Sequence, residues 1–279
     1  MTDRDYATPF TMLHAANLLG QKSRIEKFSR AIGRVVKDGD YVVDIGTGSG
    51  VLAILAAKAG ADKVTAIDIN PESIQYARIA AKMNEVDDAI EFVESHFEKY
   101  VPDNKADVVI CEMLSSIMLV EQQIPASAHA VEHILKSDGV ILPQEITIFL
   151  VPVECTDIWE RFRFNDLEFP RVVQTATREV TRDLADMQVL ESIDLTKLKR
   201  DTRIDNTLQF KAVDKGVVHG VVGVFESKLL DDITLNMKDG WKPLLIPLTE
   251  PIDVDVGHVL SFRITYQPGK FDTLSLEVS

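Results

Sequence analysis

The sequence predicts an α/β protein in which a doubly wound parallel sheet carries an amino-terminal helical cap and a second, β-rich domain at its carboxyl end. Three observations lead to this prediction. Residues 41–150 alternate short apolar runs with longer helical patterns, and a glycine-rich turn follows the first run. Beyond residue 150 the apolar runs are short and are broken by Gly, Pro and Asp, which is typical of antiparallel strands. We therefore expect a cap over residues 1–40, a doubly wound domain over 41–150 and a barrel-like domain over 151–279.

The amino-terminal region has the periodicity of an amphipathic helix over residues 9–36. One face of this helix would be apolar, and we expect that face to cover the edge of the sheet or the ligand cleft. The apolar stripe consists of Leu13, Leu18, Leu19, Ile25, Phe28, Ile32 and Val36.

The middle of the chain alternates predicted strands and helices. "DYVVDIG" and "KVTAIDI" indicate buried strands, and "GVLAILAAKAG" between them indicates a helix that ends at Gly60. "NPESIQYARIAAKMN" is expected to be a helix because Asn70 can cap it and Pro71 suits its first position. Further strands are expected in "AIEFVES", "ADVVICE" and "GVILPQEITIFLVPVE", with a helix in "VEQQIPASAHAVEHILK" between the last two. This order of elements is that of a doubly wound sheet.

The carboxy-terminal half is rich in predicted strands. "TLQFKAV", "VVHGVVGVFESKL", "WKPLLIPL" and "HVLSFRITYQPGKFDTLSLEV" are extended runs separated by turn residues, which indicates an antiparallel barrel or sandwich. "TREVTRDLADMQVLESIDL", which precedes all of them, is ambiguous, and we interpret it as a partly helical arm.

The composition excludes several classes of protein. With 46% hydrophobic and 27% charged residues the chain is typical of soluble globular proteins. No apolar run approaches membrane-spanning length and the first ten residues lack a signal-peptide pattern, so no membrane partner and a cytoplasmic location are expected. Cys111 and Cys155 lack paired spacing, which favours reduced thiols. His129 and His133 lie one helical turn apart without an evident further ligand, so we predict a helix surface and no metal site.

The formal net charge is −14, from 44 acidic and 30 basic residues. Such a surface repels phosphate backbones, so no nucleic-acid partner is expected. It suits a cationic substrate such as a basic protein, although acidity that serves only solubility would look the same.

The glycine-rich turn lies in "VVDIGTGSGVLAILAAKAG" and contains Asp44, Gly46, Gly48 and Gly50. Glycine lets the backbone approach a ligand closely, and a ligand binds at this end of a parallel strand. Counted from Gly48, the pattern satisfies the dinucleotide fingerprint; counted from Asp44, it resembles the first motif of class I S-adenosylmethionine-dependent methyltransferases. A purely structural turn is the third interpretation. Asp68, which ends the next predicted strand, can accept ribose hydroxyl protons from either cofactor.

A glutamate at the end of the predicted strand "ADVVICE" separates the two cofactors. Glu112 would face the ligand cleft at the carboxyl edge of the sheet. An acid there has little use in hydride transfer from a nicotinamide, whereas it can bind a cationic group beside a sulfonium. This position therefore favours methyl transfer with S-adenosyl-L-methionine as the cofactor.

Glu112 and Glu121 stand nine residues apart around the uncharged run in "CEMLSSIMLVE". On a continuous helix nine residues turn through about 900°, so the two side chains would point to opposite faces. They can converge only if Glu112 lies outside the helix, at a strand end or in a loop that folds back. The simpler interpretation of Glu121 is a helix-start acid that complements the helix dipole.

With these residues the sequence resembles the protein arginine methyltransferases over most of its length. That family has a loop with two glutamates nine residues apart, which bends back so that both carboxylates grip one guanidinium; Glu112 and Glu121 match this spacing. The resemblance implies a Rossmann-like domain with a β-barrel, a protein substrate with arginine as the leading acceptor, and Glu112 and Glu121 as catalytic residues. Family members commonly dimerise through an arm of the barrel, so a homodimer through the segment after Phe164 is a further hypothesis.

The resemblance also implies roles for other residues. Arg24 in "QKSRIEKFSRAI" would pair with the carboxylate of the cofactor, with an ordinary surface salt bridge as the alternative. Asp68 matches the ribose-binding acid. Glu98 in "SHFEKY" falls where the family binds the adenine amino group, with a solvated acid as the alternative. Trp241 aligns with the tryptophan of the family's Thr-His-Trp loop, and we expect it in the barrel core rather than against the substrate.

The sequence departs from the family pattern at three places. Leu114, Ser115 and Ser116 stand where the family has Met-Gly-Tyr. Gly240 replaces the loop histidine, and only Tyr6 represents the amino-terminal tyrosine motif. The glycine-loop half also resembles ribosomal-protein lysine methyltransferases. The alternatives that stay open are methyl transfer to Cys, His, Gln, Lys or a small molecule, a non-catalytic adenosylmethionine-binding subunit, and an NAD-dependent oxidoreductase.

Overall fold

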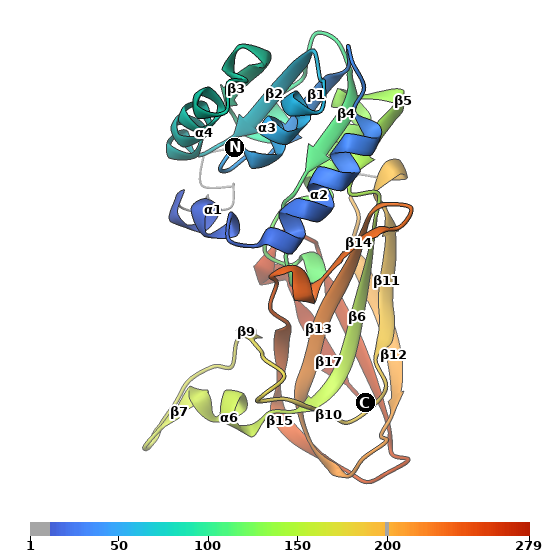
Figure 1. Ribbon diagram of the computed structural model, residues 1–279. Coiled ribbons are helices and arrows are strands. Elements are labelled where there is room, and N and C mark those ends of the chain that lie inside the picture. Colours follow the sequence, from blue (N-terminus) through green and yellow to red (C-terminus); the bar gives the residue numbers. More distant parts are fainter. Residues whose placement is uncertain (1–11, 199–200) are drawn as a thin grey trace.

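A five-stranded parallel sheet forms the first domain of the computed structural model, which describes residues 12–198 and 201–279 (Figure 1). Its order is β3-β2-β1-β4-β5, and all neighbouring strands are parallel. The chain order reverses between β1 and β4, where doubly wound sheets bind their ligands outside the carboxyl ends of the strands. The strands are β1 (Tyr41–Ile45), β2 (Lys63–Asp68), β3 (Ile90–Glu94), β4 (Ala106–Cys111) and β5 (Leu135–Leu142). The predicted fold class is confirmed in this half.

Two helices of this domain begin where the sequence predicts, and a third begins later. α3 (Val51–Lys58) follows the glycine turn directly, and α4 (Pro71–Met83) is capped by Asn70, whose side chain accepts the backbone N–H of Glu72 at 2.9 Å. α5 (Gln123–His129) continues into a π-helical turn, η5 (Ala130–Ile134). The helix predicted from Val120 therefore starts later, because the residues before it belong to a loop.

The cap contains two helices instead of the single predicted one. α1 (Met12–Leu18) and α2 (Lys22–Val35) are separated by a turn at Gly20, whose N–H donates to the carbonyl of Asn17 at 3.1 Å. α2 contacts α3 of the first domain and β14 of the second, so it joins the two. Residues 1–11, with Tyr6, and the side chain of Leu13 lie outside the described part of the chain.

Antiparallel strands form the second domain, as predicted. The long central strand β13 (Gly216–Leu230) pairs with β6, β14 and β15. The other strands of its sheet are β6 (Glu145–Glu154), β9 (Gln174–Thr175), β10 (Arg182–Asp183), β11 (Gln188–Asp194), β14 (Ile233–Asn236) and β15 (Leu244–Val254). A three-stranded sheet of β12 (Ile204–Lys211), β16 (Val259–Tyr266) and β17 (Ser275–Val278) completes the barrel-like shape (Figure 1).

Two sequence expectations about this domain are wrong. The strand-forming run "GVILPQEITIFLVPVE" is divided between β5 and β6, which belong to different sheets, because Pro143 between them has no N–H for a strand ladder. The predicted domain boundary at residue 150 thus falls inside β6. The segment interpreted as a partly helical arm forms β10 and β11 instead, since both find pairing partners on β6.

The arm of the second domain lies earlier in the chain. It consists of the short helix α6 (Thr156–Trp159), the 3₁₀ turn η6 (Glu160–Phe162) and a hairpin of β7 (Arg163–Phe164) and β8 (Leu167–Glu168). Figure 1 shows this segment projecting sideways from the barrel.

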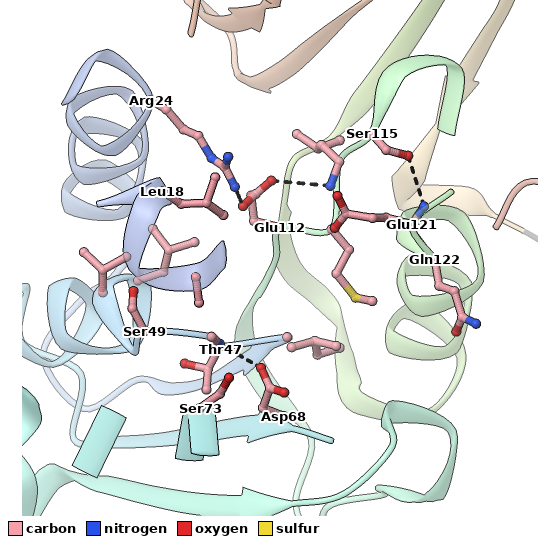
Figure 2. Close-up of a pocket in the computed structure, with 18 of the residues that line it drawn as sticks. Leu18, Arg24, Thr47, Ser49, Asp68, Ser73, Glu112, Ser115, Glu121 and Gln122 are labelled. Carbon is pink, nitrogen blue, oxygen red and sulfur yellow. Dashed lines mark hydrogen bonds and ion pairs between the residues drawn. The ribbon is translucent and has the colours of Figure 1, made fainter. Parts of the chain in front are cut away.

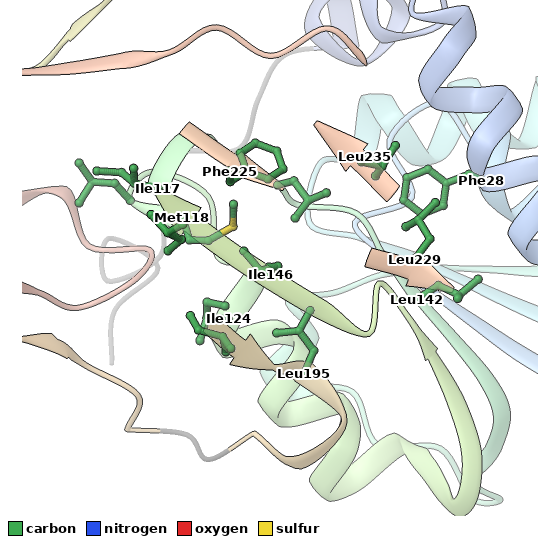
Figure 3. Packing of buried hydrophobic residues seen from close by; sticks show 14 of the residues in the cluster. Phe28, Ile117, Met118, Ile124, Leu142, Ile146, Leu195, Phe225, Leu229 and Leu235 are labelled. Carbon is green, nitrogen blue, oxygen red and sulfur yellow. The ribbon is translucent and has the colours of Figure 1, made fainter. Parts of the chain in front are cut away.

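One hydrophobic cluster extends across both domains (Figure 3). Phe28 of α2 and Leu142 of β5 belong to it, together with Phe225 and Leu229 of the barrel strand β13. The loop between Glu112 and Glu121 contributes Ile117, Met118 and neighbouring apolar residues to the same cluster. The cleft between the domains is therefore backed by a shared core.

The described residues contain no helix long and apolar enough to cross a membrane. They also contain no group of three or more His, Cys, Asp or Glu side chains able to hold a metal ion. The expectation of a helix surface at His129 is wrong: its side chain is buried, and Nε2 lies 2.9 Å from the carbonyl oxygen of Tyr100. A buried imidazole needs such a partner.

Candidate active site

A cavity of about 400 Å³ lies at the carboxyl ends of β1, β2 and β4 (Figure 2). The glycine turn and Asp68 form one side of it, and Glu112 and Glu121 form another. The cap contributes Leu18 and Arg24, and the barrel contributes Trp241. The cavity thus brings together residues from all three predicted regions of the chain.

Two of the predicted glycines line this cavity. Gly46 and Gly48 have φ values of 73° and 53°, in the left-handed region that favours glycine. The N–H of Gly48 donates to Asp68 Oδ2 at 2.8 Å, and the N–H of Asn70 donates to Oδ1 at 2.8 Å. Burial raises the pKa of Asp68, while these two backbone hydrogen bonds lower it. Asp68 is therefore held rigidly at the cavity wall, with lone pairs left to accept ribose hydroxyls.

Asp44 and Gly50 do not line the cavity, although the sequence suggested a cofactor contact for both. Asp44 is 1% exposed, accepts a hydrogen bond from Thr47 Oγ1 at 2.6 Å, and has a pKa raised to about 7 by burial. A Cβ at Gly50 would lie 2.8 Å from Cβ of Ala77 on α4. Both residues shape the glycine turn from behind rather than face the ligand.

Glu98 also lies outside the cavity. It sits in the 3₁₀ turn η3 (Phe97–Lys99), where its N–H donates to His96 Nδ1 at 3.3 Å and its side chain is 49% exposed. The buried ring of Phe97 fixes this orientation. Ser95, His96 and Phe97 line the cavity in its place, so an adenine contact from Glu98 stays a prediction that would need the side chain to turn inward.

Glu112 and Glu121 both line the cavity despite their separation in sequence (Figure 2). Glu112 directly follows β4, and Glu121 precedes α5, so neither lies within a helix. We call residues 112–121 the glutamate loop. Ser115 Oγ accepts the N–H of Glu121 at 3.1 Å and that of Val120 at 3.3 Å, which folds the loop back on itself. The side chains of Glu112 and Glu121 therefore converge on one cavity, as the predicted clamp requires.

The base of the glutamate loop is closed by Gln123, a fully buried residue that sequence reasoning missed. Its Oε1 accepts the N–H of Met113 at 2.8 Å, and its Nε2 donates to Ser127 Oγ at 3.0 Å. No local pattern distinguishes this glutamine from a surface residue of α5. Only the position of β4 relative to α5 identifies its role.

Arg24 places a guanidinium at the two glutamates. It forms an ion pair with Glu112, and its guanidinium lies 4.5 Å from the ring centroid of Trp241. Burial lowers the pKa of Arg24 to about 10, while the charge of Glu121 raises it. Burial also raises the pKa of Glu121 to about 7, and Arg24 lowers it. The alternative interpretation of Arg24 as an ordinary surface salt bridge does not hold, because the ion pair with Glu112 is buried.

Trp241 lines the cavity as well as packing in the barrel. Its ring packs edge-on against Phe225, and its Nε1 donates to the carbonyl of Leu114 in the glutamate loop at 2.8 Å. From the sequence we expected a core role alone. The aromatic face toward Arg24 is decided by contacts between segments far apart in the chain.

The loop before Trp241 joins the barrel to the cap. Asp239 is 3% exposed and accepts hydrogen bonds from Ser23 Oγ at 2.6 Å and Lys27 Nζ at 2.7 Å, both on α2. Gly240 stands where the protein arginine methyltransferases have the histidine of their Thr-His-Trp loop. It has a φ of 122°, and a Cβ at this position would lie 2.5 Å from Gln21 Oε1. Gln21 therefore occupies space that a side chain at position 240 would need.

Comparisons with known proteins find methyltransferases among the relatives of this chain. The family model of the ribosomal protein L11 methyltransferase PrmA matches residues 29–148. An uncharacterized protein of Methanocaldococcus jannaschii is 31% identical over 256 residues, 91% of each chain. The arginine N(omega)-methyltransferase of Streptomyces achromogenes is 26% identical over 88% of this chain and 74% of its own.

The arginine methyltransferases of eukaryotes give a shorter sequence match and a longer structural one. Protein arginine N-methyltransferase PRMT10 of Oryza sativa is 33% identical over 58% of this chain. The matched region spans 43% of the length of that relative. A chain of the Trypanosoma brucei PRMT1 enzyme-prozyme complex with AdoHcy superposes with a TM-score of 0.77 at 20% identity, over 94% of this chain and 95% of that one. This structural likeness shows a common fold.

The doubly wound sheet, the glycine turn and the family match define a class I methyltransferase, and S-adenosylmethionine is its cofactor. Within that class, the chain belongs to the same family as the M. jannaschii protein, and it is similar to the protein arginine methyltransferases. The predictions of fold, enzyme class and cofactor are confirmed, and the nicotinamide and non-catalytic alternatives are wrong.

Proposed function

We propose that the protein transfers the methyl group of S-adenosylmethionine to a guanidinium nitrogen of arginine. One observation carries this proposal: the site already holds a guanidinium, that of Arg24, between the Glu112 carboxylate and the ring of Trp241. Paired carboxylates and an aromatic face are what a planar cation requires. Glu121 lies beside them with its charge coupled to Arg24.

The residues present fit the cofactor. Asp68 would accept hydroxyl protons of its ribose, and Gly46 and Gly48 leave room for close approach. Arg24 would pair with the carboxylate of the cofactor and leave Glu112. The guanidinium of the acceptor would then take its place at Glu112. The cofactor supplies an electrophilic methyl group on a sulfonium.

The glutamates make the acceptor nucleophilic. A guanidinium is protonated and shares its electrons across the plane, so it attacks poorly. Glu112 and Glu121 would hold it by paired hydrogen bonds in line with the methyl group and stabilise its charge. As the nitrogen–carbon bond forms and the sulfur–carbon bond breaks, one guanidinium proton leaves. The raised pKa of Glu121 suits it to take up this proton.

The acceptor on this proposal is an arginine side chain of a protein. The cavity opens between the two domains, and the net charge of −14 favours a basic partner. Free arginine is the second candidate, because the Streptomyces relative named for arginine itself covers most of this chain. Lys242, exposed and lining the cavity, could then bind the α-carboxylate.

The experiment supplies methyl-labelled S-adenosylmethionine with either free arginine, an arginine-rich peptide or a lysate, followed by hydrolysis and mass spectrometry. Labelled methylarginine from the peptide and lysate supports the protein substrate, whereas label on free arginine alone supports the second candidate. Label on Cys, His, Gln or Lys would overturn the acceptor. Turnover that survives Glu112→Gln combined with Glu121→Gln would overturn the glutamate clamp.

A homodimer and a cytosolic location belong to the same proposal. The arm exposes Phe164 and Leu167, Phe169 is exposed directly after it, and α4 exposes Ile79 and Met83 on its outer face. Exposed apolar surfaces of this kind favour association, and we propose that the arm of one copy covers α4 of the other. Both cysteines of the chain are free and buried, in keeping with a reducing compartment.

A further inference from the structure

The middle of the glutamate loop has an unusual backbone conformation at two adjacent residues. Ile117 has a φ of 52° and Met118 a φ of 55°, in the left-handed region that residues with side chains rarely adopt. A β-branched residue such as isoleucine is especially disfavoured there. Both residues are fully buried. Such backbone conformations persist only where the surrounding structure holds them.

Residues of the barrel hold Ile117 and Met118 in this conformation. The hydroxyl of Tyr266, at the end of β16, donates to the carbonyl of Ile117 at 2.7 Å, and the N–H of Gly269 donates to the carbonyl of Met118 at 3.0 Å. The side chain of Ile117 lies against Gly223 of β13, where a Cβ would come within 2.2 Å of Ile117 Cγ2. Figure 3 shows Ile117 and Met118 among the barrel side chains.

The flanking residues of the loop are attached to the barrel as well. Trp241 Nε1 donates to the carbonyl of Leu114, and Ser116 Oγ donates to the carbonyl of Lys242 at 2.5 Å. The stretch from Leu114 to Met118 is thus held from outside the sheet domain. The positions of the two glutamates at its ends depend on these contacts.

We propose that Tyr266 is a positioning residue for methyl transfer, whose hydroxyl holds Ile117 in its left-handed conformation and so sets the placement of Glu112 and Glu121. Tyr266 is fully buried and is not among the residues that line the cavity, so it acts through the loop. Burial raises its pKa well above 10, which keeps the phenol a hydrogen-bond donor at every working pH. The inference rests on the proposed guanidinium clamp.

The test compares Tyr266→Phe with Tyr41→Phe in the full chain. The first change keeps the ring and removes only the hydroxyl. The control removes a hydroxyl that bonds Thr65 and Tyr100 at 2.9 Å, away from the loop. We measure kcat, the KM for the acceptor, the Kd for S-adenosylmethionine and amide hydrogen exchange in residues 113–121.

For Tyr266→Phe we expect kcat to fall at least tenfold, with the cofactor Kd within twofold of wild type and faster exchange confined to the loop. The control keeps wild-type values of all four. Gly223→Ala, which pushes Ile117 aside without altering Tyr266, should reproduce the loss of kcat and the faster exchange.

Two outcomes would overturn the proposal. One is unchanged kcat and exchange in Tyr266→Phe. The other is a fall in kcat that is matched by weaker cofactor binding and faster exchange throughout the barrel, which a purely structural tyrosine would produce. Because exchange and cofactor binding need no acceptor, they test Tyr266 even if no guanidinium proves to be methylated, a result that would overturn only the proposed function.

Discussion

At the scale of single residues, the site depends on charges that are buried together. Arg24, Glu112 and Glu121 lie within one cavity where little water can screen them. A buried carboxylate favours its protonated form unless a cation compensates. The cation that compensates Glu121 is Arg24, and burial still raises the pKa of this glutamate to about 7. Its protonation state should therefore change within the working range of the enzyme.

The pH dependence of catalysis follows from this residue. Protonated Glu121 cannot accept a proton or stabilise a guanidinium, so kcat/KM should rise with pH through an apparent pKa near 7. The measurement is a pH–rate profile of wild type and Glu121→Gln. The variant should be slower and lack this rise; the same rise in the variant would assign it to another group.

The stability effect of Glu121 has the opposite sign. Its pKa is higher in the folded chain than the ordinary value of 4.5, so folding favours the protonated form and stability falls as pH rises from 4.5 to about 7. Glu121→Gln should remove this loss of stability with rising pH. The free energy of unfolding of the variant should exceed that of wild type by a margin that grows up to pH 7. Urea unfolding at pH 4.5, 6 and 7.5 measures this; a gap that narrows with pH would contradict it.

Trp241 should determine the affinity for the acceptor. Trp241→Phe removes the hydrogen bond to Leu114 and weakens the cation–π contact, so we expect the KM for the acceptor to rise about 3- to 30-fold. The other tryptophan, Trp159, lies in the arm and provides a matched control. Steady-state kinetics of both variants test this; equal changes in KM would show that the effect is not local.

At the scale of elements, the glutamate loop and α2 are held from the barrel side. A left-handed residue other than glycine costs roughly 1–2 kcal/mol, and a hydrogen bond contributes about 0.5–1.5 kcal/mol. The hydrogen bonds from Tyr266 and Gly269 are thus of the size needed to offset the two left-handed residues of the loop. The barrel is part of the active-site scaffold.

Asp239 should be the main attachment of α2. Burial alone would raise its pKa, but the hydrogen bonds from Lys27 and Ser23 outweigh this and lower it. A lowered pKa means that its stabilising contribution is present at neutral pH and is lost as pH falls below about 4. Asp239→Asn should lower the free energy of unfolding by about 1–3 kcal/mol at pH 7, a loss that shrinks toward pH 3.

The control for this change is Asp232→Asn. It breaks an exposed ion pair between Asp232, which lies between β13 and β14, and Arg34 of α2. Exposed ion pairs contribute little, so the free energy of unfolding of this variant should stay near that of wild type. Denaturant unfolding at both pH values makes the comparison. A pH-independent loss in Asp239→Asn would mean that packing rather than charge is responsible.

At the scale of the whole molecule, the two domains share one core, and apolar residues remain exposed on the arm and on α4. The shared core makes this protein unlike one whose domains move independently, because such domains usually meet in smaller and more polar interfaces. The unburied apolar side chains are therefore where the proposed second copy would bind.

Replacing apolar residues of the arm should disrupt the proposed homodimer. Phe164 and Leu167 are 68% and 58% exposed at the hairpin tip, so Phe164→Ser with Leu167→Ser should give a monomer without loss of folding. Sedimentation equilibrium at micromolar concentration measures the mass. Val256→Ser, at an equally exposed barrel position, is the control. A monomeric wild type would contradict the homodimer itself.

Local patterns in the sequence determined most elements of this protein and the kind of cofactor it uses. Strand-length apolar runs, the glycine turn and the Asn70 cap each act over a few residues, so their physical effects can be read from the chain order. For the same reason the sequence alone was enough to place Asp68 at the cavity, where its contact with a ribose stays a prediction.

Only the tertiary structure decided which candidate side chains meet. Glu98 turned outward because Phe97 is buried, while Asp44 and Gly50 support the turn from behind. The convergence of Glu112 and Glu121 depends on Ser115 within the loop and on Tyr266, which bonds a residue 149 positions away. Contacts over such separations leave no local pattern, because they exist only once two domains have packed against one shared core.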